Sequence, residues 1–207
     1  KAVPYLIQTL ERKPEEQDFL LNKKSAEALG ILADPRGVSV LIRALFMAST
    51  IQGTSYPQAR VALVRMGKPA VKPMVEALEG KDEKLNAMAK QLEFKDGVVL
   101  GKLSRVLGDM MAVDAVPSLI KILAEAKLDA GDYTKGIDGV IEALGKIFDP
   151  RAMDPLLALL QDKKADYKIR MQVCNALTVL GDKKSLPILL EGAQKWLIEG
   201  GYTNLKD

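Results

Sequence analysis

A short motif that returns along the chain constrains the fold more than any other feature of these 207 residues. The stretch from Gly30 to Arg36 aligns without a gap with the stretch from Gly145 to Arg151, and both contain an Asp-Pro-Arg step. A glycine that follows a large apolar residue recurs at intervals of about 36 to 41 residues, a period typical of two-helix repeats. These glycines are Gly30, Gly67, Gly108, Gly145 and Gly181. No alternating strand pattern competes with this period, so the sequence predicts an all-α fold.

The local chemistry of the motif predicts where the helices begin and end. We expect each recurring glycine to close a first helix, because glycine adopts the left-handed conformation that ends a helix at no steric cost. The carboxylates of Asp34 and Asp149 can then accept hydrogen bonds from free amides at the start of the second helix, and the prolines that follow suit its first position. Arg36 and Arg151 are expected to reach carboxylates or free carbonyls of the adjoining repeat.

The second helices share an apolar doublet followed, three positions on, by another apolar residue, as in Leu41-Ile42 with Leu45. This spacing places one apolar stripe on the side that faces the neighbouring helices. We therefore expect first helices near residues 18–30, 57–67, 97–108, 133–145 and 166–181. We expect second helices near residues 2–12, 37–47, 69–79, 114–126, 152–161 and 185–198.

Two stretches depart from the period. Residues 48–56 are polar and contain glycine, which predicts a loop. Residues 81–96 are charged but carry apolar residues at roughly helical spacing, which predicts either an additional helix or a long extension into the next first helix, with Gly97 marking a break. Insertions of this kind usually project from one face of a solenoid and sometimes contact the partner.

We expect these elements to form one domain over residues 1–198, followed by a C-terminal tail at residues 199–207. Its predicted architecture is an α–α superhelix of about five helix pairs with a leading half-repeat, because a single repeat cannot bury its own apolar face. In the last copy Leu189-Leu190 is followed by Ala193, which predicts an atypical end that caps the stack. Since the chain begins inside a second helix, we expect it to be a fragment of a longer solenoid.

The segments Ala28-Leu29-Gly30 with Asp34-Pro35-Arg36, and Ala143-Leu144-Gly145 with Asp149-Pro150-Arg151, resemble HEAT repeats. They are most similar to the HEAT-like subset named for phycobilisome lyases, and the likeness covers almost the whole chain. Met66-Gly67-Lys68 departs from the pattern, because no Asp-Pro-Arg step follows it. The resemblance implies a curved stack of antiparallel helix pairs with the second helices on the concave face, and it implies scaffolding and protein binding.

The chain contains no histidine, which narrows its chemistry. Without imidazole it has no serine–histidine or cysteine–histidine nucleophile system, no histidine metal site and no ordinary proton shuttle near neutral pH. The single cysteine, Cys174, lies in an apolar helical pattern and is expected to be a core residue. We therefore expect no enzyme activity, no cofactor and no metal in these residues.

The resemblance to HEAT repeats also predicts a partner surface, formed by the residues that follow the apolar doublets on the concave face. This row consists of Gln8, Arg43, Glu76, Lys121, Ala158 and Glu191. It contains two cations and two anions, whereas a solenoid that binds nucleic acid should present a basic stripe. Lys plus Arg exceed Asp plus Glu by only 30 to 27, and no apolar run is long enough to span a membrane.

The predicted function is an interaction scaffold that binds a protein partner of unknown identity through the concave face, the 81–96 insertion or both, as one subunit of a larger assembly. Two alternatives stay open: a HEAT-fold enzyme related to bilin lyases, and a nucleic-acid-binding solenoid. The iron-dependent hydroxylases of this fold use His-Glu ligand pairs, which residues without histidine cannot supply. We favour a cytoplasmic location, and the periplasm stays open if a signal sequence has been removed.

Overall fold

The computed structural model describes residues 1–12, 16–126, 136–162, 165, 167–181, 186–187 and 189–190. The α-helices are α1 (Val3–Leu10), α2 (Phe19–Leu32), α3 (Val38–Ala44), α4 (Tyr56–Met66), α5 (Lys68–Leu78), α6 (Glu83–Gln91), α7 (Val98–Asp109), α8 (Val116–Glu125), α9 (Ile137–Ile147), α10 (Met153–Gln161) and α11 (Tyr167–Leu180). Short 3-10 turns precede three second helices: η2 (Pro35–Gly37), η3 (Val113–Ala115) and η5 (Pro150–Ala152). The predicted all-α solenoid is confirmed, although most of the expected last helix at 185–198 lies outside the described residues.

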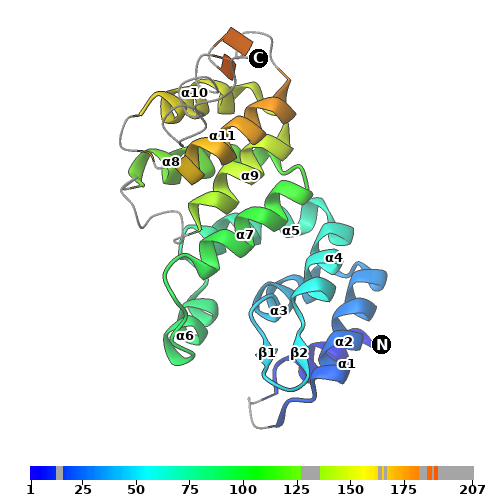
Figure 1. Ribbon diagram of the computed structural model, residues 1–207. Coiled ribbons are helices and arrows are strands. Elements are labelled where there is room, and N and C mark those ends of the chain that lie inside the picture. The colour runs from blue at the N-terminus through cyan, green and yellow to red at the C-terminus, as the bar shows by residue number, and fades with distance from the viewer. Residues whose placement is uncertain are drawn as a thin grey trace, which may run out of the picture.

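The helices stack in two layers, as Figure 1 shows. The first helices α2, α4, α7, α9 and α11 form one layer, in which α2 packs on α4, α7 on α9, and α9 on α11. The second helices α1, α3, α5, α8 and α10 form the other layer, and each contacts a first helix of its own or the neighbouring repeat. The apolar side chains between the layers form one continuous core.

The left-handed residues that end the first helices reveal the repeat register. They are Ala33, Gly67, Met111, Phe148 and Gly181. The residue four positions before each of them is a leucine without solvent exposure: Leu29, Leu63, Leu107, Leu144 and Leu177. The prediction that each recurring glycine closes a helix is therefore right for Gly67 and Gly181 and wrong for the other three.

Gly30, Gly108 and Gly145 lie inside their helices, where they permit close contact with the next first helix. A Cβ atom at Gly30 would lie 2.6 Å from the Cα of Ala62, and one at Gly145 would lie 2.8 Å from the Cα of Ala176. Both distances are shorter than a carbon–carbon contact allows. A side chain as small as methyl would therefore push neighbouring first helices apart.

The predicted helix-start role of the two aspartates is confirmed. Asp34 accepts a hydrogen bond from the backbone N–H of Arg36, and Asp149 accepts one from Arg151, at the entrance of η2 and η5 respectively. Each arginine side chain also pairs with the aspartate of its own motif, with an N–O distance of 2.7 Å. Arg151 additionally reaches the preceding repeat, by donating to the carbonyl oxygen of Val113 at 3.3 Å.

The Asp149–Arg151 pair predicts a specific acid dependence of stability. The side chain and then the backbone N–H of Arg151 lower the pKa of Asp149 to about 2, below the value of about 3.9 in an unfolded chain. The unfolded chain therefore binds more protons, and the contribution of Asp149 is present above about pH 4 and lost as the pH falls toward 2. Thermal unfolding at several pH values measures the effect. The Tm of Asp149→Asn should fall less on acidification than the Tm of the wild type. Asp154→Asn, an exposed position on α10, serves as the control, and parallel profiles for wild type and Asp149→Asn would contradict the assignment.

The two departures from the period have different structures. Residues 48–56 contain a two-residue antiparallel pair, β1 (Ala48–Ser49) with β2 (Gly53–Thr54), in which Ala48 faces Thr54. The loop prediction is therefore right apart from this minimal hairpin. The additional helix predicted within residues 81–96 is confirmed as α6.

Candidate functional site

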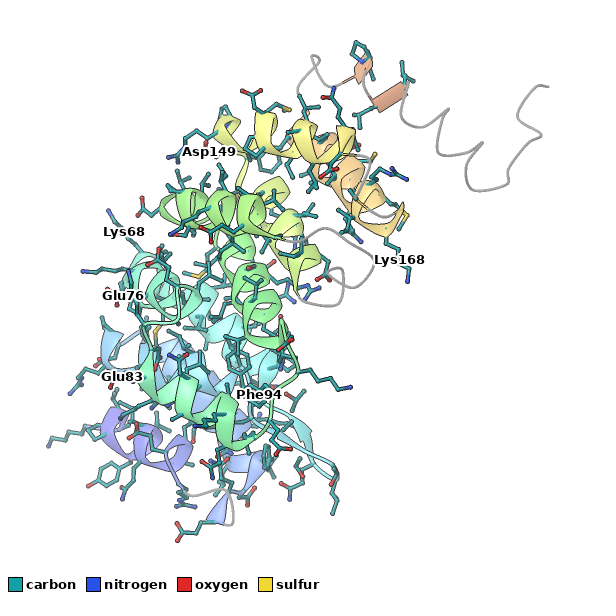
Figure 2. The ribbon with its side chains drawn as sticks, turned by 90° about the vertical axis from the view of Figure 1, so that its left-hand side faces the viewer. Lys68, Glu76, Glu83, Phe94, Asp149 and Lys168 are labelled. Carbon is teal, nitrogen blue, oxygen red and sulfur yellow. The ribbon has the colours of Figure 1, made fainter. Side chains whose placement is uncertain are left out.

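The exposed surface of α5, α8 and α10 forms the best candidate for a contact surface, and we call it the second-helix face. Figure 2 looks onto it, with α10, α8 and α5 one above another and Glu76 on α5. Glu76, Lys121 and Ala158, three members of the predicted row, are exposed on these successive helices. Among the described residues, the two charged side chains make long ion pairs within their own helices, Lys72–Glu76 at 3.9 Å and Lys121–Glu125 at 4.0 Å. Exposed pairs of this kind contribute little to stability, so these charges are free to meet a partner.

A groove of about 420 Å³ runs between α8 and α10 at this face. It is lined by Ile120, Leu123, Ala124, Ala126, Pro155, Ala158, Leu159 and Asp162. Ala158 thus leaves space where a longer side chain would fill the groove. An apolar depression beside exposed charges of both signs has the general character of a protein-binding surface, with an apolar centre and a polar rim.

The remaining predicted residues do not join this face. Gln8 is exposed on α1 and lines a separate hollow of about 460 Å³ near Arg36. Arg43 requires a correction, because its side chain is buried: only 8% of the residue is exposed. Its guanidinium donates to Glu11 at 2.6 Å and to Ser39 at 2.8 Å, so it stabilises the α1–α3 contact. Glu191 lies outside the described residues.

Arg43 is held by contacts within the stack. Its guanidinium is bonded to Glu11, at the end of α1, and to Ser39 on its own helix. Residues of the insertion approach the same region, since Lys84 lies 3.6 Å from Glu11 and the ring of Phe94 packs 5.6 Å from that of Phe46. The row expected on the concave face is therefore interrupted at α3.

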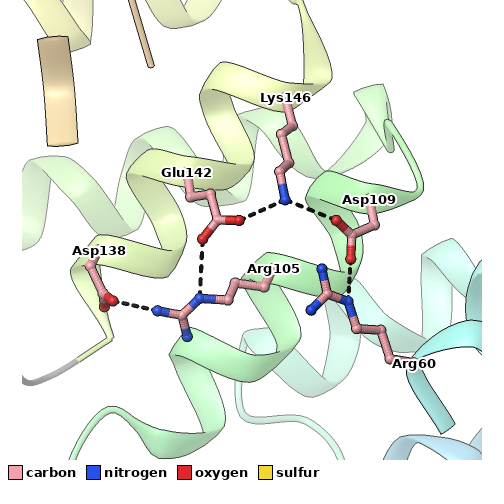
Figure 3. Close-up of polar contacts among 6 residues, drawn as sticks. All are labelled: Arg60, Arg105, Asp109, Asp138, Glu142 and Lys146. Atoms are coloured by element: carbon pink, nitrogen blue, oxygen red, sulfur yellow. Dashed lines mark hydrogen bonds and ion pairs between the residues drawn. The ribbon is translucent and has the colours of Figure 1, made fainter. Parts of the chain in front are cut away.

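Figure 3 shows a cluster of charged residues on the first helices that the sequence pattern did not predict. Its members are Arg60 of α4, Arg105 and Asp109 of α7, and Asp138, Glu142 and Lys146 of α9. Asp109 lies at its centre, accepting hydrogen bonds from Arg60 at 2.5 Å and from Lys146 at 3.0 Å. These contacts connect three consecutive first helices.

The other half of this first-helix cluster joins α7 to α9. Lys146 donates to Glu142 at 2.6 Å, Arg105 donates to the other oxygen of Glu142 at 3.1 Å, and Arg105 also pairs with Asp138. The sequence does contain a signal, since Asp138, Glu142 and Lys146 recur every four residues and therefore share one helix face. This spacing does not identify the residues on α4 and α7 with which the three side chains pair.

The neighbouring charges in the cluster favour the charged forms of Asp109 and Lys146. Burial alone raises the pKa of Asp109, but the hydrogen bonds from Arg60 and Lys146 outweigh it and the pKa is lowered. Burial likewise lowers the pKa of Lys146, but its bonds to Glu142 and Asp109 reverse the direction and the pKa is raised. Every carboxylate of the cluster has a cationic partner, so the arrangement provides ion pairs that connect the first helices.

A half-buried lysine reinforces the junction between α7 and the N-terminal helices. Lys102 donates to the carbonyl oxygen of Leu45 at 2.9 Å and lies 5.2 Å from the ring of Phe46 and 5.1 Å from that of Tyr56. Burial lowers its pKa. The carbonyl and the aromatic faces stabilise the ammonium group, which ties α7 to the segment after α3.

The described residues offer little for metal or thiol chemistry. In that part of the chain no three His, Cys, Asp or Glu residues are grouped closely enough to bind a metal ion. Cys174 is half-buried against the core, as its sequence context predicted, and burial raises the pKa of its thiol to about 11. No helix among the described residues has the length and apolar character needed to cross a membrane.

Comparison with known proteins supports the repeat assignment. Residues 137–196 match the family model for HEAT repeats, and no curated protein matches the chain. The complex of CpcE and CpcF of phycocyanin lyase from Nostoc sp. PCC7120 has a similar structure, with 21% identity and a TM-score of 0.52 over 91% of this chain and 67% of that chain. Human deoxyhypusine hydroxylase in complex with glycerol is 20% identical with a TM-score of 0.37, over 86% of this chain and 73% of that chain.

These comparisons correct one prediction. The expectation that the chain is not an enzyme is wrong as an exclusion, because a structure with the same fold belongs to phycocyanin lyase. The lack of histidine removes particular catalytic mechanisms and leaves other kinds of catalysis open. The predicted resemblance to HEAT-like repeats is confirmed: residues 137–196 match HEAT repeats, and the chain has the fold of a helical solenoid.

Proposed function

We propose that the chain binds a protein partner through the second-helix face of α5, α8 and α10, as one subunit of a larger assembly. The observation that carries the proposal is the apolar groove between α8 and α10, two helices that also carry the exposed residues Lys121 and Ala158. A partner side chain that enters the groove would bury Ile120, Ala124 and Pro155, and the charges would orient it.

Three further considerations support a protein partner. The face presents both signs of charge, which favours a complementary protein surface over a phosphate backbone. Its helices belong to a rigid stack, so a partner would find the groove largely preformed. The structurally similar phycocyanin lyase is itself a complex of two chains, CpcE and CpcF. Catalysis by such an assembly is compatible with this role, since a subunit can bind its partner while the chemistry takes place at a shared site.

Reversing both charges of the face tests the proposal. We expect Glu76→Lys combined with Lys121→Glu to reduce capture of the partner at least tenfold, because each charge then meets a like charge, at a cost of several kcal/mol in the complex. The measurement is affinity capture from lysate of the source organism with quantitative mass spectrometry, comparing the wild type and the variant.

The matched control is Lys24→Glu with Glu27→Lys, which reverses an exposed pair on α2 and also leaves the net charge unchanged. This control variant should capture the partner as efficiently as the wild type does. If the variant of α5 and α8 is folded and still captures the same proteins as the wild type, the second-helix face is not the contact surface.

A further inference from the structure

The first helices form two groups within the solenoid. In Figure 1, α7, α9 and α11 lie side by side, and α2 lies beside α4. Among the described pairs of consecutive first helices, α4 and α7 share the smallest contact. Helix α5 packs more extensively on α7 and η3 than on α3 and α4, so it belongs with the group of α7. We call α1–α4 the N-terminal half, and α5 with α7–α11 the C-terminal half.

Within each half, a glycine–alanine contact brings consecutive first helices together. The glycine directly follows the buried leucine of its own helix, and the alanine directly precedes the buried leucine of the next helix. An added Cβ atom at the glycine would lie only 2.6 to 2.8 Å from the Cα of the alanine. These pairs are Gly30–Ala62, Gly108–Ala143 and Gly145–Ala176.

The equivalent positions at the junction of α4 and α7 are both valine. Val64 follows the buried Leu63 of α4, and Val106 precedes the buried Leu107 of α7. Two β-branched side chains therefore stand where the other junctions have a hydrogen atom and a methyl group. Because van der Waals contact keeps these larger groups apart, α4 and α7 cannot approach as closely as the other first helices do.

Long polar side chains span the α4–α7 junction. Arg60 of α4 donates to Asp109 of α7 at 2.5 Å (Figure 3), and Lys102 of α7 donates to the carbonyl oxygen of Leu45 at 2.9 Å. The side chains of Arg60 and Asp109 are 33% and 18% exposed, so water and salt reach the pair. Accessible ion pairs of this kind weaken as the ionic strength rises.

The chain passes between the two halves at glycines with left-handed backbone. Gly67, with φ of 62°, connects α4 to α5. Gly80 and Gly97, with φ of 75° and 80°, flank the insertion, whose Phe94 packs on Phe46 of the N-terminal half. Added Cβ atoms at Gly67 and Gly80 would meet nothing within 4 Å. Glycine changes its backbone angles at little steric cost, and residues at the ends of helices commonly absorb the rotation of a hinge.

We propose that the solenoid bends between α4 and α7, with its two halves moving as separate bodies, and that the Arg60–Asp109 pair holds this junction closed. The contact of α5 with α3 forms the pivot, because it lies in the second-helix layer, opposite the first-helix junction that opens. Opening changes the distance of α1 and α3 from α8 and α10. It leaves the groove between α8 and α10 unaltered, so the hinge is separate from the contact proposed at that groove.

Ionic strength and binding partners both act on this hinge. At about 1 M salt the Debye length is only about 3 Å, so the Arg60–Asp109 attraction is screened and the open form gains population. A partner that contacts both halves selects one hinge angle, since it shifts the equilibrium by its difference in affinity for the two forms. The second-helix layer can thereby adjust to partners of different curvature.

Distances between spin labels measure the hinge directly. One pair of labels crosses the junction, with Lys24→Cys on α2 and Asp154→Cys on α10, and a second pair lies within the C-terminal half, with Lys121→Cys and Thr178→Cys. These positions are exposed, and Cys174→Ala removes the native thiol from every protein. Pulsed electron paramagnetic resonance then gives the distribution of distances for each pair at low and at high salt.

We expect Arg60→Met to raise the ratio of open to closed molecules about tenfold, because it removes an ion pair that is intermediate between exposed and buried. Asp109 keeps its bond to Lys146 in this variant, so the C-terminal half stays intact. The distances of the crossing pair should shift and broaden, and the wild type should shift in the same direction at high salt. The pair within the C-terminal half should not change.

The matched control is Arg105→Met, which removes ion pairs with Asp138 and Glu142 from the same cluster but within the C-terminal half. Its crossing distances should match those of the wild type. Identical crossing distances in wild type and Arg60→Met, at both salt concentrations, would overturn the inference. Equal broadening by Arg105→Met would also overturn it, because the whole stack would then be loose. These distances are recorded without a partner, so they do not bear on the charge reversal at α5 and α8.

Discussion

Replacing Gly145 with alanine is expected to lower the free energy of unfolding by about 1–3 kcal/mol, although alanine is the better helix former. On an exposed helix the same substitution would stabilise by about 1 kcal/mol, because glycine loses more backbone entropy on folding. Here the new Cβ would lie 2.8 Å from the Cα of Ala176 and 2.9 Å from its Cβ. The helices α9 and α11 must separate to admit it, and the cost of that movement exceeds the gain in helix propensity. Chemical denaturation followed by circular dichroism measures the difference.

The repeat offers a matched control at the equivalent position of α11. Thr178 also lies three residues before a left-handed helix end, but it is exposed. Thr178→Ala should therefore be neutral or slightly stabilising, as helix propensity alone predicts. Gly30→Ala should resemble Gly145→Ala, since its Cβ would lie 2.6 Å from the Cα of Ala62. If both glycine variants were more stable than the wild type, close helix contact would not be the reason for these glycines.

Replacing Asp109 with asparagine is expected to destabilise the chain by about 1–2 kcal/mol. The neutral side chain leaves Arg60 and Lys146 without the carboxylate that both now contact. Loss of one member of a fully buried pair costs about 3–5 kcal/mol, and solvent reduces that figure here because Arg60 and Lys146 are about one-third exposed. The effect should be local to the α4–α7–α9 contact, so hydrogen exchange should increase there first.

A double-mutant cycle separates the pair interaction from other effects of the substitution. Arg60→Met alone and Asp109→Asn alone should each destabilise, and the double variant should lose less than their sum, because the second change removes a partner that is already unpaired. Glu27→Gln removes an exposed ion pair on α2 and should leave the unfolding midpoint almost unchanged. Additive losses in the cycle would show that Arg60 and Asp109 do not stabilise the chain through their contact.

The burial of Arg43 explains why the predicted contact row was only partly useful. Periodicity correctly identified α6 as a helix, and it correctly placed Glu76 and Lys121 on exposed sides of α5 and α8. Arg43 has the same place in its own repeat, yet it is buried, and its guanidinium is bonded to Glu11 at the end of α1. A pattern within one helix does not identify the partners that a neighbouring helix provides.

The sequence by itself determined the two-helix period, the helices that the structure describes and the starts of two second helices. These properties depend on interactions within a few residues, such as the capping bond from Arg151 to Asp149 and the i, i+3, i+4 apolar spacing. Only the tertiary structure decided the register of the repeats, in which Leu63 corresponds to Leu29 although the recurring glycines suggest otherwise. It also decided that Asp109 joins residues as distant as Arg60 and Lys146. The physical reason is that helix periodicity repeats along one axis, whereas contacts between helices depend on how their axes are placed relative to one another.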